Sequence, residues 1–143
     1  MDEQRKVVVA TPDAPAAVGA YSQAVVANGF IFLSGQVPLD PATGKLIPSI
    51  DPAEQARQVM RNLHAVLQAA GADFSYVVRA GIFLADINDF AAVNEVYAEA
   101  FEDGVKPARA TIQVGALPLG AKVEIEMTAL VPLTRDASQH EQT

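Results

Sequence analysis

The sequence PARATIQV at residues 107–114, followed by LPLGAKVEIE at residues 117–126, decides how this chain folds. The pattern predicts two short strands joined by a loop that contains proline and glycine as turn residues. Side chains alternate between the two faces of a strand, so Arg109 and Glu124 each stand on a polar face of their strand. A guanidinium and a carboxylate fixed on rigid backbone can recognise a small anion and position a water. The pattern alone favours a simpler interpretation, an ion pair across the two strands on a solvent-exposed face.

Further strands are expected upstream of this stretch. Asn28 and Gly29 tolerate positive φ at both turn positions, which is a strong signal for a β-hairpin. The last strand is expected to extend to about residue 131. The remaining predicted strands cover residues 5–9, 21–27, 30–34 and 76–84.

Two helices are expected, each with one apolar stripe. Asp51 is a suitable N-cap and Pro52 suits the first helical position, so a helix is predicted to run to about residue 70. A second helix is predicted to start after Asn88 and to end at Gly104, because glycine readily terminates a helix.

This order of elements predicts an α+β fold with one domain over residues 1–133. Because each helix has only one apolar stripe, both helices should pack on one face of a mixed six-stranded sheet. The other face of the sheet must then meet solvent or another chain. Residues 134–143 are polar and are expected to form a disordered tail.

Composition excludes several classes of function. The net charge of −7 disfavours both a nucleic-acid-binding surface and binding to anionic membranes. The chain has no cysteine, an acidic N-terminus without the layout of a signal peptide, and no apolar run long enough to span a bilayer. A cytoplasmic protein is therefore expected. Of the two histidines, His64 has helical spacing from apolar residues that indicates a surface or packing role, so no metal site is expected.

Several separated motifs together resemble the RidA (YjgF/YER057c/UK114) family, formerly described as endoribonuclease L-PSP. The resemblance covers roughly residues 14–131. The motifs are APAAVGAYSQA at 14–24, LSGQ at 33–36, DINDF at 86–90 with Val93 and Asn94, and the stretch at 107–126.

This resemblance implies a single-domain chorismate-mutase-like fold and a homotrimer with three clefts between subunits. The implied activity is the hydrolysis of small 2-imino acids, such as 2-iminobutanoate and 2-iminopropanoate, to 2-keto acids and ammonia. Such imines are released by pyridoxal-phosphate enzymes, and the family itself needs no cofactor.

The resemblance also implies roles for particular residues. Arg109 corresponds to the arginine that holds the substrate carboxylate, and Glu124 to the glutamate that positions the attacking water. Thr111 stands where many members have cysteine. A site that uses the backbone carbonyl at this position would tolerate threonine, whereas a site that uses the thiol would lose activity. The other corresponding cleft residues are Tyr21, Ser34, Gly35 and Asn94.

The residues themselves leave alternatives open. Glu126 shares the strand face of Glu124 at roughly 6.6 Å, so it is an equally good base on pattern alone. Without the resemblance, Tyr21 would be assigned to packing, Ser34 to satisfying backbone groups and Asn94 to a solvated helix surface.

Three functions are therefore weighed. An imine-hydrolysing enzyme needs a group that captures the substrate carboxylate and a general base, and Arg109 and Glu124 can supply these without a metal or a covalent nucleophile. A non-catalytic module that binds small carboxylates needs only Arg109. An endoribonuclease is disfavoured by the acidic charge and by the absence of a catalytic histidine pair.

Overall fold

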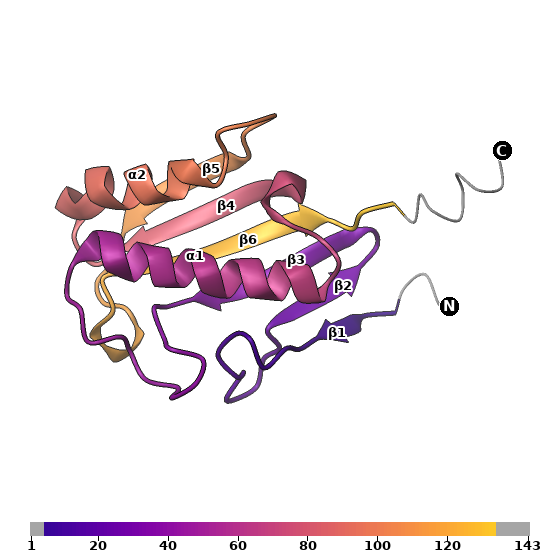
Figure 1. Ribbon diagram of the computed structural model, residues 1–143, viewed down its shortest axis with the longest axis horizontal. Coiled ribbons are helices and arrows are strands. Elements are labelled where there is room, and N and C mark those ends of the chain that lie inside the picture. Colours follow the sequence, from indigo (N-terminus) through magenta and orange to yellow (C-terminus); the bar gives the residue numbers. More distant parts are fainter. Residues whose placement is uncertain (1–4, 134–143) are drawn as a thin grey trace, which may run out of the picture.

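The computed structural model describes residues 5–133 and has the predicted α+β architecture. A mixed six-stranded sheet carries both α-helices on the same face (Figure 1). The predicted tail at residues 134–143 lies outside the described residues. No helix among the described residues is long and apolar enough to cross a membrane.

The order of the strands separates two segments that are neighbours in sequence. β5 lies at one edge and pairs in parallel with β4, while β6 lies between β3 and β4; all pairs other than β4–β5 are antiparallel. In sheet order, the strands are β1 (Val7–Val9), β2 (Ala24–Ala27), β3 (Phe30–Gln36), β6 (Val123–Leu130), β4 (Val77–Leu84) and β5 (Ala108–Gln113).

The sequence correctly predicted the hairpin between β2 and β3, where Asn28 and Gly29 have φ of 52° and 83°. The start of β2 differs, since the strand begins at Ala24 rather than at residue 21. The carbonyl of Gln23 still accepts a hydrogen bond from the N–H of Ser34 in β3, but the buried side-chain amide of Gln23 also bonds the backbone of Thr11, Ala14 and Pro15 and ties this segment to the preceding loop.

Helix α1 (Pro52–Ala69) begins as predicted, because the Asp51 side chain accepts a hydrogen bond from the backbone of Ala53. Its apolar face lies against β3 and β6. The fully buried side chains on this face include Val59, Leu63, Val66 and Leu67.

Helix α2 (Phe90–Glu99) is shorter than expected, since it ends five residues before Gly104. Backbone hydrogen bonds from Ala100 to Tyr97 and from Phe101 to Ala98 tighten the last turn, and the Phe101 ring is buried against Tyr97. The start also differs: a short 3-10 turn at Ile87–Asp89 precedes α2. Together, β4, α2 and β5 form a crossover unit that places β5 parallel to β4.

The two faces of the sheet have opposite characters. On the face beneath the helices, buried apolar side chains form the core, among them Ala80, Ile82 and Leu84 of β4 and Ile125 of β6. The face away from the helices, here called the uncovered face, has large apolar side chains in solvent. Phe32 is 48% exposed, Ile112 49% and Leu130 42%.

Candidate functional site

Arg109 is held against helix α2. It pairs with Ala80 across β5 and β4, so its side chain leaves the sheet on the helix-covered face. There Nη1 donates a 2.6 Å hydrogen bond to Oδ1 of Asn94. The guanidinium carbon lies 5.5 Å from the ring centre of Phe90 and 5.1 Å from that of Tyr97. Asn94, which the sequence placed among the site residues, is therefore a direct partner of Arg109.

Two hollows border the Arg109 side chain. One, of about 600 Å³, is lined by Ile87, Asn88, Phe90, Arg109 and Thr111. The other, of about 420 Å³, is lined mainly by side chains of α2 and of the segment before β5, including Asn94, Tyr97 and Lys106. A small anion could thus reach the guanidinium from either side.

Two hydroxyl groups near Arg109 are buried without a hydrogen-bond partner among the described residues: Oγ1 of Thr111 and the phenol oxygen of Tyr97. Burial raises the pKa of the Tyr97 phenol, and the positive charge of Arg109 offsets part of that rise. The Tyr97 phenol is therefore neutral at physiological pH. We call Arg109, Asn94 and Thr111 the arginine cluster.

Glu124 lies on the opposite face of the sheet. Glu124 pairs with Phe83 of β4, which lies three positions from Ala80, the β4 partner of Arg109. Because side chains alternate along a strand, Glu124 points to the uncovered face. Its side chain lies directly on Gly35 of β3. A Cβ atom at position 35 would overlap a carboxylate oxygen of Glu124 and would stand 3.0 Å from the carboxyl carbon. Only glycine leaves room for this carboxylate.

The surroundings of Glu124 make it a better base than an ordinary glutamate. Partial burial raises the pKa of Glu124, and the negative charge of Glu126 raises it further. Glu126 lies two positions along β6 on the same face and is more exposed than Glu124. Its carboxylate lies over Gly81, with one oxygen 3.3 Å from the place where a Cβ atom of residue 81 would stand. The two glutamates therefore differ in their exposure to solvent, with Glu124 the more buried of the two.

Ser34 joins this region to the loop before β2. Its hydroxyl donates a 2.6 Å hydrogen bond to the carbonyl of Ser22, and its backbone N–H donates to the carbonyl of Gln23. Tyr21, immediately before Ser22, is 52% exposed and lies in a loop rather than at the start of a strand. We call Glu124, Gly35 and Ser34 the glutamate cluster.

The structure does not bring the arginine and glutamate clusters together within one chain. They lie on opposite faces of the sheet, and β4 separates β5 from β6. The ion pair between Arg109 and Glu124 that the sequence pattern favoured is therefore wrong, because the two strands are not neighbours and the two side chains diverge.

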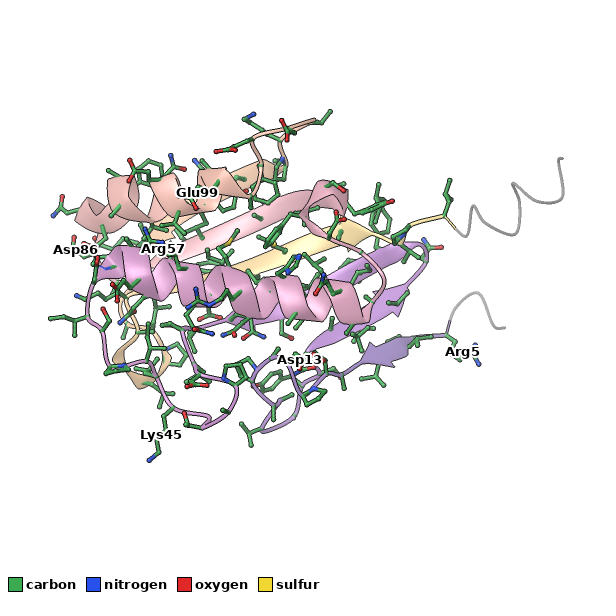
Figure 2. The ribbon with its side chains drawn as sticks, in the orientation of Figure 1. Arg5, Asp13, Lys45, Arg57, Asp86 and Glu99 are labelled. Atoms are coloured by element: carbon green, nitrogen blue, oxygen red, sulfur yellow. The ribbon has the colours of Figure 1, made fainter. Side chains whose placement is uncertain are left out.

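A third hollow, of about 590 Å³, lies between the two helices and is lined by none of the predicted site residues. Arg57 of α1 and Glu99 of α2 border it, and Figure 2 shows both on the helical side of the molecule. His64 also lines it and packs against Phe74, with ring centres 5.2 Å apart, as its spacing predicted. Among residues 5–133, no three His, Asp or Glu side chains gather as metal ligands would.

The sequence interpretation did not identify Phe90 and Tyr97 as neighbours of Arg109. The usable signal was their spacing, since Phe90, Asn94 and Tyr97 follow one another at four and three residues and share one side of a helix.

Known proteins resemble this chain over most of its length. The sequence model of the family described as Endoribonuclease L-PSP matches residues 11–131. A 2-iminobutanoate/2-iminopropanoate deaminase of Rattus norvegicus is 51% identical over 123 residues, which are 86% of this chain and 88% of that protein.

Solved structures agree with this relationship. The Rid-family protein YyfA of Yersinia pestis is 46% identical, with a TM-score of 0.86 over 89% of this chain and 100% of its own. The crystal structure of E. coli TdcF with bound serine is 36% identical, with a TM-score of 0.80 over 87% of this chain and 98% of its own. With this fold and with matches that cover most of its length, the chain belongs to the RidA family of Endoribonuclease L-PSP proteins.

Proposed function

We propose that this protein is a 2-iminobutanoate/2-iminopropanoate deaminase, which hydrolyses small 2-imino acids to 2-keto acids and ammonia. The observation that carries the proposal is that relatives from rat, cow and human, 48–51% identical over 86–89% of this chain, bear this name. The chain keeps the two charged groups that such a reaction needs, Arg109 and Glu124.

Arg109 captures the substrate. Asn94 engages Nη1, which leaves the N–H groups on Nε and Nη2 to bind the substrate carboxylate through two parallel, charge-assisted hydrogen bonds. Capture fixes the imine carbon relative to the protein and converts an encounter in solution into an oriented reaction.

Glu124 activates the water. Its carboxylate accepts a proton as the water oxygen bonds to the imine carbon, and the electron pair of the C=N bond moves to nitrogen, which takes up a proton. The resulting carbinolamine then expels ammonia as its hydroxyl loses a proton, so that the keto group forms. The raised pKa of Glu124 suits a residue that both accepts and returns a proton. The phenol of Tyr21 can orient the imine nitrogen or the water. No metal or cofactor takes part, which makes the enzyme a cofactor-independent hydrolase acting on a C=N bond.

A complete site needs a second copy of the chain, because Arg109 and Glu124 diverge from opposite faces of one sheet. We therefore include a homotrimer in the proposal, with the uncovered faces packed together and the clefts between subunits. Exposed Phe32, Ile112 and Leu130 supply apolar surface for that contact. A cytoplasmic location, without nucleic-acid or membrane partners, completes the proposal.

The test couples the protein to an enzyme that generates 2-iminopropanoate or 2-iminobutanoate in the presence of semicarbazide. An active deaminase hydrolyses the imine before the trap captures it, so semicarbazone formation falls. Arg109→Ala and Glu124→Gln should each abolish the fall. Glu126→Gln is the matched control, a neighbouring carboxylate on the same face, and should retain most of the activity.

A carboxylate-binding module is the second candidate, because the related TdcF was crystallised with serine bound. Such a module would bind pyruvate equally well after Glu124→Gln and would leave semicarbazone formation unchanged at every protein concentration. Those two results together would show that the protein is a carboxylate-binding module and not a deaminase.

A further inference from the structure

The guanidinium of Arg109 lies close to two aromatic rings of one helix. Phe90 and Tyr97 are two turns apart on α2, with Asn94 between them. Their ring centres lie 5.5 Å and 5.1 Å from the guanidinium carbon, within the range of a cation–π interaction. Arg109 thus rests along a stripe of α2 made of a ring, an amide and a second ring.

The ring of Tyr97 is itself firmly held. Tyr97 is only 5% exposed, and its ring packs on that of Phe101 with centres 4.8 Å apart. Phe101 in turn packs edge-on against Phe74 at 5.6 Å. Arg109, in contrast, is exposed, at an edge strand. The rings therefore provide a fixed surface for a side chain that would otherwise sample many rotamers.

An aromatic support suits an arginine that must bind a carboxylate. A carboxylate neighbour would use the same N–H groups that the substrate needs, and among residues 5–133 the only side-chain hydrogen bond of Arg109 is the one to Asn94. A ring attracts the cation through its π face and uses no N–H donor. The support therefore holds Arg109 and leaves its Nε and Nη2 donors free for a ligand.

We propose that Phe90 and Tyr97 are positioning residues, which hold the guanidinium of Arg109 in place for capture of the substrate carboxylate. This rests on the proposed function, because it takes Arg109 as the group that binds the carboxylate. Their rings act before the chemical step, so their loss should raise KM and leave kcat nearly unchanged.

For Tyr97, the ring rather than the hydroxyl holds the guanidinium of Arg109. Its phenol oxygen is buried and makes no hydrogen bond among the described residues, so it does not hold Arg109. Tyr97→Phe should therefore keep full affinity, whereas Tyr97→Leu should not. This pair separates the ring from the hydroxyl at one position.

The experiment compares Phe90→Leu, Tyr97→Leu and Tyr97→Phe with the wild type. The matched control is Tyr76→Leu, which removes another half-buried ring that lies outside the stack of Tyr97, Phe101 and Phe74. Pyruvate is the probe, and its dissociation constant is measured by NMR titration. In ligand-free protein, the Nε–Hε resonance of Arg109, assigned by its loss in Arg109→Lys, reports the ring currents of Phe90 and Tyr97.

The two ring-removing variants at positions 90 and 97 should move the Arg109 resonance and weaken pyruvate binding by about two- to thirtyfold. KM should rise by a similar factor with kcat unchanged. Tyr97→Phe and Tyr76→Leu should leave the affinity unchanged. If Tyr97→Leu does not fold, the half-buried Phe90→Leu together with Tyr97→Phe still decides the matter.

Unchanged pyruvate affinity in Phe90→Leu, or an unmoved Arg109 resonance, would overturn the positioning role. Equal weakening by Tyr76→Leu would also overturn it, since the effect would then come from general loosening of the fold. If the wild type shows no deaminase activity but the resonance and the pyruvate affinity respond as expected, the positioning role stands and the proposed reaction fails.

Discussion

The carboxylate of Glu124 occupies the space that a side chain at position 35 would fill, so Gly35 and Glu124 fit together between two paired strands. The pairing of β3 with β6 shifts register between Leu33 and Gln36, and this irregularity brings Gly35 beneath the glutamate. A backbone feature of β3 thus determines where Glu124, the proposed general base, lies on β6.

Gly35→Ala should displace the Glu124 carboxylate and lower kcat by about a hundredfold, because small misplacements of a catalytic group are costly. The semicarbazone assay measures the loss. Gly115→Ala is the control, since nothing lies within 4 Å of a Cβ there, and it should leave kcat unchanged. Full activity in Gly35→Ala would show that the position of the carboxylate does not matter.

The pH dependence of kcat/KM should follow Glu124. The base must be deprotonated, and its pKa is raised by burial and by Glu126, so activity should fall on acidification at a higher pH than for an ordinary glutamate. Glu126→Gln removes the neighbouring negative charge, lowers the pKa of Glu124 and should move the acidic limb to lower pH. A limb that moves upward or not at all would mean that another group controls the profile.

Asn94→Asp should impair substrate capture more than Asn94→Ala. The alanine variant loses one hydrogen bond to a charged group, and KM should rise about three- to tenfold. The aspartate variant would form an ion pair with Arg109 that competes with the substrate carboxylate. Steady-state kinetics at low ionic strength give both values, and a lower KM for the aspartate variant would contradict this role of Asn94.

Mixing two inactive variants should restore activity if each site combines two chains. In a mixed trimer of Arg109→Ala and Glu124→Gln subunits, one of three sites receives both intact residues, so a random equal mixture should recover about a quarter of the wild-type activity. The measurement needs the two variants to be unfolded and refolded together. Recovery of none would show that both residues of a site come from one chain, or that the chains do not assemble as proposed.

Local sequence signals predicted the helices and strands well, but they predicted less well which segments contact one another. Asp51 and Pro52 marked the start of α1, and Asn28 and Gly29 marked the hairpin, because caps and tight turns depend on adjacent residues. The start of β2 was placed too early, because the alternation of side chains does not show that Gln23 bonds the backbone of Thr11 and Pro15 in the preceding loop.

The candidate residues could be named from the sequence, but their arrangement could not. Arg109 and Glu124 were proposed because their strand positions and motifs are local. That they diverge follows from the insertion of β6 between β3 and β4, a long-range pairing that period-two alternation cannot reveal. The contact of Arg109 with Phe90 and Tyr97 likewise depends on the crossover that lays α2 beside β5.

The divergence of Arg109 and Glu124 has a consequence for catalysis by a population of chains. In the proposed trimer, every chain serves two reaction centres at once, one with its arginine and another with its glutamate. A free chain then has no complete centre, so activity per chain depends on protein concentration. Dilution should abolish activity while every chain remains folded. A chain with a defect at Arg109 or at Glu124 should inactivate one of the two centres that it serves and leave the other intact.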